Sequence, residues 1–511
     1  MHWLPLPEPS RKIEAAFHDP ASARDWLARQ PQTLALYMLG ALHSQIEAID
    51  AAALPPATAI QLLGLLRSAA VPVQASVEAR FFRKPLPLPE EDQRCCELAQ
   101  QLWTSLGIAY LRRVPHLLPV DRSLPLNRAA CAFRMAEYCH FQASRQCPVL
   151  LDQLLFAVLA EASRYELLRQ PISDPDFPHL GEANIAGHLA WAFMLRLIDP
   201  YRLTATELIV ANRALSRWRE LTGFQSEPDE DKKSRAVDLQ PLFGEDLPEG
   251  VPRWLNLRTV DRKIQQRVAS LKAGESPEAL KLGRELSASA CIRLLGELEN
   301  SLHSPPQRPD GETGQVELFF GGDNAFAIFN GELLNPLGKL DTSSASLAHD
   351  RVAMFGFDQA AQVSTTVKKI KLPCETWSLD KGMAVRPADL DNVRRMSPCL
   401  IATRQEQTPR LGVLFGLQTT ADGALTGGLH WYEEEVEAGW LKRPGPPNPN
   451  APRVAAFLLE HDAALSLILP VNAGVRLETG LALEGTSVAH VLPYEVLERG
   501  VDYVRYACRC G

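Results

Sequence analysis

At 511 residues the chain is too long for one ordinary hydrophobic core, and its length predicts about three domains. Hydrophobic residues make up 46% of the sequence and charged residues 22%, which is typical of globular proteins and not of disordered ones. The formal net charge of −8 gives no overall field that would attract a nucleic-acid polymer. A general DNA- or RNA-binding function is therefore not expected.

The ten cysteines form no C-x-x-C pair, so the spacing gives no zinc-finger or thioredoxin-type site, and no metal site is expected. The N-terminus has no basic region followed by an apolar one, as a signal peptide would. The most apolar helical stretch, residues 149–168, is interrupted by acidic and basic residues, which argues against a membrane span. We expect a cytoplasmic protein.

Residues 1–303 have the apolar spacing of successive α-helices, with the clearest patterns at 33–49, 90–111 and 149–170. This pattern predicts a helical domain over residues 1–175 and a second helical region over 176–303. Thr204 and Glu207 have capping-box spacing, and Ser276 followed by Pro277 predicts the start of a helix that continues to about Ser301. The helices form either irregular bundles or a stacked array, although no fixed repeat is visible.

A basic and aromatic cluster follows Thr204, with Arg213, Arg217, Trp218 and Arg219 on one predicted helix. Such a helix face can bind a phosphate or an acidic partner. The alternative is a solvated helix side with Trp218 anchored in the core.

The composition changes at residues 304–314, where a run of proline, glycine and polar residues predicts a linker. Short β-type runs follow, and they predict one or two small barrels. We place one barrel at residues 315–445 and a second β module at 446–511. The predicted strands are 316–320, 325–329, 410–417, 453–459, 464–469 and 475–483.

Catalytic motifs are missing from the sequence, since it has no G-x-S-x-G, H-E-x-x-H or Walker A pattern. The adjacent Cys139 and His140 point in different directions on a helix, so core packing explains them better than a catalytic pair. We therefore expect a non-enzymatic protein with no cofactor. An enzyme whose residues meet only in three dimensions remains an alternative.

The stretch from Arg351 to Trp440 contains the frame Trp377, Leu379, Gly382 and Val385, followed by two further β-type runs. This layout resembles the PilZ domain, a small bacterial six-stranded barrel that commonly binds cyclic di-GMP. The family has an R-x-x-x-R arm before the barrel and a D/N-x-S-x-x-G turn after an early strand. Arginine side chains of the arm hold phosphates and stack on guanine.

The resemblance places Gly382 on the glycine of the turn, where the backbone must bend tightly. The two polar positions of the turn then fall on Trp377 and Leu379, and the second arginine of the arm falls on Phe355. The resemblance therefore implies a barrel whose nucleotide site is lost or rebuilt. The candidate ligand-binding residues are Arg351, Lys368, Lys369, Lys371, Asp380 and Gly382.

Together these observations predict an α+β protein, with a helical N-terminal region followed by small PilZ-like β-barrel modules. The expected function is that of a bacterial signalling or adaptor protein. Its barrel would bind cyclic di-GMP or serve as a degenerate docking module, and its helical region would contact a protein partner. Ligand binding would change how the barrel sits against the helices. The alternative is a helical scaffold or chaperone-like protein that binds only protein.

Overall fold

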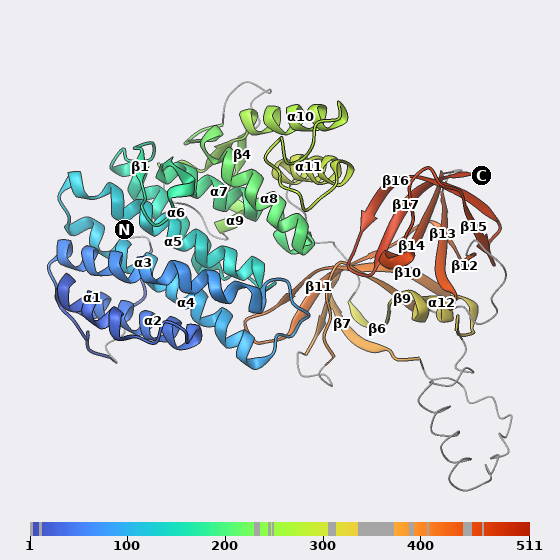
Figure 1. Cartoon of the computed structure of the whole chain (residues 1–511), viewed down its shortest axis with the longest axis horizontal. Helices are drawn as coiled ribbons and strands as arrows, with labels where there is room; N and C mark the ends of the chain where they lie inside the picture. Colours follow the sequence, from blue (N-terminus) through green and yellow to red (C-terminus); the bar gives the residue numbers. More distant parts are fainter. Residues whose placement is uncertain are drawn as a thin grey trace, which may run out of the picture. The chain divides into compact units, whose positions relative to one another are not determined.

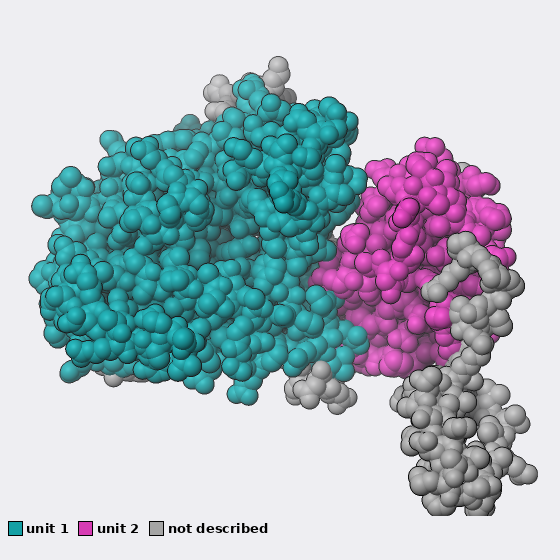
Figure 2. Space-filling model, viewed as in Figure 1, with its two compact units in different colours: residues 1–308, 387–396, 416–426 teal, residues 309–386, 397–415, 427–511 magenta. Residues whose placement is uncertain are grey.

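The computed structural model describes most of the chain (Figure 1). The described residues are 4–9, 13–228, 236–243, 247, 250–304, 313–335, 372–387, 393–405, 408–442, 452–461 and 464–511. They divide into two compact units, shown in separate colours in Figure 2. Unit 1 comprises residues 1–308, 387–396 and 416–426, and unit 2 comprises 309–386, 397–415 and 427–511.

Unit 1 is built mainly from helices, as the apolar spacing predicts. Its α-helices are α1 (Pro20–Arg29), α2 (Ala35–Ala51), α3 (Pro56–Phe81), α4 (Glu90–Arg113), α5 (Ser123–Gln142), α6 (Val149–Arg164), α7 (Ile185–Leu197), α8 (Ala205–Trp218), α9 (Gln240–Phe243), α10 (Arg258–Lys272) and α11 (Ala288–His303). One continuous core of buried apolar side chains runs through these helices. The predicted capping box at the start of α8 is confirmed, because Thr204 and Glu207 each bond the backbone of the other.

Two small sheets interrupt the helices of unit 1. Strand β1 (Ile172–Ser173) pairs with β2 (Glu182–Ala183), and β3 (Gly223–Gln225), β5 (Trp254–Asn256) and β4 (Ala236–Asp238) form a three-stranded sheet in that order. These strands are too short for an alternation of apolar and polar residues to be recognised in the sequence.

Helix α3 is long and apolar enough to span a membrane, judged by length and composition alone. In this fold α3 packs against α2 and α4, and it carries the fully buried Arg67. The Arg67 guanidinium donates to the carboxylates of Asp174 and Asp176, so the buried charge is paired inside the protein.

The chain forms two closed six-stranded barrels, with strand orders β10-β11-β8-β7-β6-β9 and β12-β13-β14-β17-β16-β15, among the residues that the structure describes. They belong to unit 2, except for the end of β10 and the start of β11, which fall in unit 1. The first contains β6 (Gly314–Phe320), β7 (Glu375–Asp380), β8 (Met383–Arg386), β9 (Cys399–Gln405), β10 (Thr408–Thr419) and β11 (Leu425–Trp431). The second contains β12 (Glu435–Lys442), β13 (Val454–His461), β14 (Ala464–Pro470), β15 (Leu481–Glu484), β16 (His490–Arg499) and β17 (Tyr503–Cys510). The predicted order of helical region followed by β-barrels is confirmed.

The two barrels share apolar packing within unit 2. Phe319 and Leu411 of the first barrel, Phe457 and Ile468 of the second, and Phe326 of helix α12 (Gly322–Asn330) belong to one buried cluster. Strand β12 belongs to the second barrel, whereas the sequence places residues up to 445 in the first.

Three predictions of secondary structure are wrong. In each case the reason is either a residue with a positive φ or an apolar run too short to interpret. Residues 325–329 form α12, which lies between Gly321 (φ +83°) and Gly331 (φ +73°), instead of a strand. A five-residue apolar run is too short to separate helix from strand by its period. Of residues 475–483 only the end enters a strand, β15, after Glu478 at φ +57°.

The helix predicted from Ser276 does not continue. The Ser276 Oγ accepts a bond from the Ala279 N–H, as expected of a cap, but Lys281 (φ +63°) and Gly283 (φ +103°) then turn the chain. Helix α11 begins only after Ser287, whose Oγ accepts from the Ala290 N–H.

Candidate functional site

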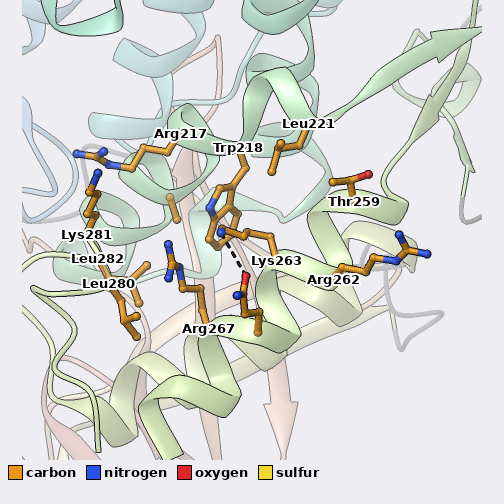
Figure 3. A pocket seen from close by; sticks show the side chains of 12 residues that line it. Arg217, Trp218, Leu221, Thr259, Arg262, Lys263, Arg267, Leu280, Lys281 and Leu282 are labelled. Atoms are coloured by element: carbon orange, nitrogen blue, oxygen red, sulfur yellow. Dashed lines mark hydrogen bonds between the residues drawn. The ribbon is translucent and has the colours of Figure 1, made fainter.

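A pocket of about 470 Å³ lies in unit 1 between α8, α10 and the turn at residues 274–287. Figure 3 shows its side chains, with the Trp218 indole near the centre. The pocket is lined by Ala214, Arg217, Trp218, Leu221, Thr259, Arg262, Lys263, Gln266, Arg267, Leu280, Lys281 and Leu282. Its volume falls in the range of small-molecule sites.

Helix α8 contributes Arg217 and Trp218 because of its amphipathic pattern. Leu208, Ala211 and Leu215 are buried on its core side, which directs Arg217 into solvent at the pocket. Trp218 has only 4% of its surface exposed, so its indole is a fixed part of the pocket lining.

Helix α10 contributes a polar face that repeats with helical spacing. Val260, Ile264 and Leu271 are buried on the other side of this helix. The pocket residues Thr259, Arg262, Lys263, Gln266 and Arg267 follow the i, i+3, i+4 rule, so one helix face brings them to the same side. In Figure 3 Lys263 crosses in front of the indole, with its Nζ bonded to Gln266 Oε1 at 3.2 Å, while Arg262 points away.

The third side of the pocket is the 274–287 turn, which Arg213 of α8 holds in place. Arg213 Nη1 donates to the Leu282 carbonyl and to Glu285 Oε2, each at 2.8 Å, and its Nη2 donates to Glu285 Oε1. This bidentate pair lowers the pKa of Glu285 to about 2 and raises the pKa of Arg213. Residue 283 is a glycine, and a Cβ at this position would collide with the side chains of Arg213 and Glu285.

Further polar contacts connect the helices around the pocket. Arg293 of α11 donates to Glu207 at the start of α8, and the His303 imidazole of α11 lies 2.8 Å from an Asp261 oxygen on α10. These contacts connect α11 to α8 and to α10, the two helices that line the pocket.

The lining of the pocket is strongly cationic. Five of its side chains are basic and none is acidic: Arg217, Arg262, Lys263, Arg267 and Lys281. Among the described residues no ion pair to a carboxylate is formed by any of these five. Guanidinium and ammonium groups in the lining favour a ligand that has negative charge.

The three arginines of the basic cluster after Thr204 make three different kinds of contact. Arg217 lines the pocket, and Arg213 forms the pair with Glu285. Arg219 is buried, donates to the carbonyls of Ser216 and Leu180, and has a pKa lowered by that burial. Both readings of the cluster therefore apply in part, since Trp218 is anchored in the core and Arg217 faces an open pocket.

The candidate residues of the barrel form no described site. Arg351, Lys368, Lys369 and Lys371 lie outside the described residues. Asp380 and Gly382 are at the β7–β8 hairpin, where Lys381 (φ +48°) and Gly382 (φ +77°) form the tight turn that the glycine predicts. Asp380 is exposed there.

Sequence reasoning missed the pocket residues of α10 and of the turn. The polar face of α10 was visible as helical spacing from Thr259 to Arg267, but nothing local shows that it faces Arg217, which lies some forty residues earlier in the chain. Lys281 could not be placed because its position depends on the turn around Gly283.

Comparison with known proteins adds one family match. No curated protein and no solved structure matches the chain. Residues 21–229 match the family model described as cyclic-di-GMP receptor FimW, N-terminal domain. The match covers less than half of the chain and includes α8, while α10 and the 274–287 turn lie beyond it. The helical part of this chain is therefore similar to the N-terminal domain of a cyclic di-GMP receptor family.

Proposed function

We propose that this protein is a cytoplasmic bacterial signalling or adaptor protein without catalytic activity, and that it binds cyclic di-GMP in the pocket between α8 and α10. The observation that carries the proposal is that five residues of the pocket lining are basic and none is acidic. The description of the family that matches residues 21–229 names the same ligand.

The chemistry of the ligand suits this pocket. Cyclic di-GMP has a phosphodiester on each side of its ring, and these negative charges need cations that are not already paired. Arg217 and Arg267 can each grip a phosphate with a planar, bidentate guanidinium, and Lys263 and Lys281 add point charges. The Trp218 indole, which is 4% exposed, forms a fixed apolar wall beneath these charges.

The barrel remains a second location for the same ligand. The resemblance of residues 351–440 to the PilZ domain would place phosphate contacts at Arg351 and Lys368, Lys369 and Lys371, and base contacts near Asp380 and Gly382. A closed six-stranded barrel supports this placement only at the level of architecture.

The test is calorimetric titration of the full chain with cyclic di-GMP. We expect binding that weakens about tenfold or more, or about 1.4 kcal/mol, in Arg217→Ala and in Arg267→Ala. The matched control is Arg164→Ala, which removes an exposed arginine of α6 outside the pocket and should leave affinity unchanged. Affinity should also fall as salt is raised, because the contacts are charged.

The outcomes separate the two locations. Full affinity in both pocket variants, with loss in Arg351→Ala, would move the ligand to the barrel. Absence of binding by the wild-type chain would overturn the function itself. Capture of a protein partner would then favour the helical scaffold alternative.

A further inference from the structure

A cluster of two carboxylates and one thiol lies in unit 1, apart from the pocket. Glu137 is on α5, Asp152 is on α6, and Cys147 is in the segment that connects these helices. One ligand atom from each of the three lies within 4.8 Å of the others. Their exposed fractions are 0%, 1% and 3% for Glu137, Asp152 and Cys147, so the cluster is sealed from solvent.

The carboxylates of this cluster lack the partners that buried carboxylates normally have. Neither oxygen of Glu137 has a hydrogen-bond partner among the described residues, and the same holds for Oδ1 of Asp152. Only Asp152 Oδ2 is bonded, by Arg196 Nη2 of α7 at 3.3 Å. Leaving polar oxygens buried and unpaired costs free energy, which a cation bound to these oxygens would offset.

We propose that Glu137, Cys147 and Asp152 bind a zinc ion or a similar divalent transition metal. A thiolate with two carboxylates is a donor set that zinc accepts, at about 2.3 Å from sulfur and about 2.1 Å from oxygen. Ligand atoms of one such site lie roughly 3.5 Å apart, so small side-chain rotations bring these three groups together.

A bound divalent metal would offset much of the negative charge of the cluster. Ionised Glu137, Cys147 and Asp152 have three negative charges, the metal supplies two positive ones, and Arg196 is ion-paired to Asp152. Thiolate and carboxylate ligands bind a metal in their ionised forms, so metal binding displaces the protons that they hold.

The surroundings hold the donors in position. The Cys147 N–H donates to the Tyr201 hydroxyl at 3.0 Å, and that hydroxyl donates to the Arg145 carbonyl at 2.8 Å. Arg196 occupies Asp152 Oδ2 and leaves Oδ1 for the metal. An outer group that orients a ligand in this way is a regular feature of metal sites.

The experiment uses the full chain, stripped with a chelator and titrated with Co²⁺ as a spectroscopic substitute for zinc. We expect about one Co²⁺ per chain, with a thiolate-to-cobalt charge-transfer band. The band should disappear in Cys147→Ser and persist in Cys96→Ser, which removes a buried cysteine of α4. Zinc should raise the melting temperature of the stripped wild type and of the Cys96→Ser variant.

A second variant keeps the test decisive if Cys147→Ser does not fold. Glu137→Gln retains the thiol and the shape of the side chain, so it should keep a weaker charge-transfer band, with affinity reduced roughly tenfold or more. A wild-type chain that shows no thiolate band, or a band that is unchanged in Cys147→Ser, overturns the proposal.

Discussion

His188 on α7 is a histidine that the fold keeps uncharged. It is 1% exposed, and its Nδ1 has no hydrogen-bond partner among the described residues. Burial holds the pKa of His188 well below its usual 6.5, and the nearby Arg134 and Arg219 lower it further. In the unfolded chain the same imidazole takes up a proton below about pH 6.5.

This difference predicts how stability depends on pH at the scale of one residue. Below about pH 6.5 the unfolded state binds a proton at His188 that the folded state does not bind. The free energy of unfolding is therefore highest above about pH 6.5 and falls as the pH decreases. His188 should contribute a slope of up to about 1.4 kcal/mol per pH unit. Denaturant unfolding from pH 7 to pH 5 should give a flatter slope for His188→Gln.

The matched control for that experiment is His18→Gln, which replaces an exposed histidine and should keep the wild-type slope. His140, whose pKa burial lowers to about 3, remains in both variants and keeps some pH dependence. Equal slopes in the wild type and in His188→Gln would contradict the assignment.

At the scale of elements, the 274–287 turn determines whether the pocket has its third side. Gly283 has φ +103°, and a Cβ there would meet the Arg213 and Glu285 side chains that hold the turn. Gly283→Ala should therefore destabilise the turn by about 1–3 kcal/mol and weaken cyclic di-GMP binding. Chemical denaturation and calorimetry measure the two effects.

Gly274→Ala separates backbone strain from disruption of the Arg213–Glu285 pair. Gly274 also has a positive φ, +95°, but a Cβ at this position has no atom within 4 Å. This variant should lose some stability and keep its ligand affinity. Equal affinity losses in the two variants would show that the pair is not what shapes the pocket.

At the scale of the whole molecule, the mechanism proposed for signalling is that the bound ligand changes an equilibrium between arrangements of the two units. A ligand can shift such an equilibrium only by its differential affinity for the arrangements. We expect the small-angle X-ray scattering curve of the full chain to change when saturating cyclic di-GMP is added.

The scattering curve of Arg217→Ala should change less at the same ligand concentration, because less of the pocket is filled. An unchanged wild-type curve, at a concentration where calorimetry shows saturation, would contradict a ligand-driven rearrangement. The protein would then act as a receptor whose output does not depend on the placement of its units.

Much of the architecture could be predicted from the sequence, because it depends on local pattern. The apolar spacing of α2, α4 and α6, the Thr204–Glu207 capping box and the short β-type runs of β10, β13 and β14 predict elements that the structure confirms. The change of composition at residues 304–314 predicts a linker, and the first stretch of unit 1 ends within this range, at Arg308. Each of these signals is contained within a few turns or one strand.

The tertiary structure alone decided the candidate sites. Arg217, Arg267 and Lys281 meet at one pocket, and Glu137, Cys147 and Asp152 meet in one sealed cluster, although neither set has a motif spacing. Helices α8 and α10 both pack against α11, and α5 packs against α6 and α7, which brings these side chains together. The sequence gives the identity of each side chain. Its neighbours depend on how distant helices pack against one another, and local periodicity does not predict that packing.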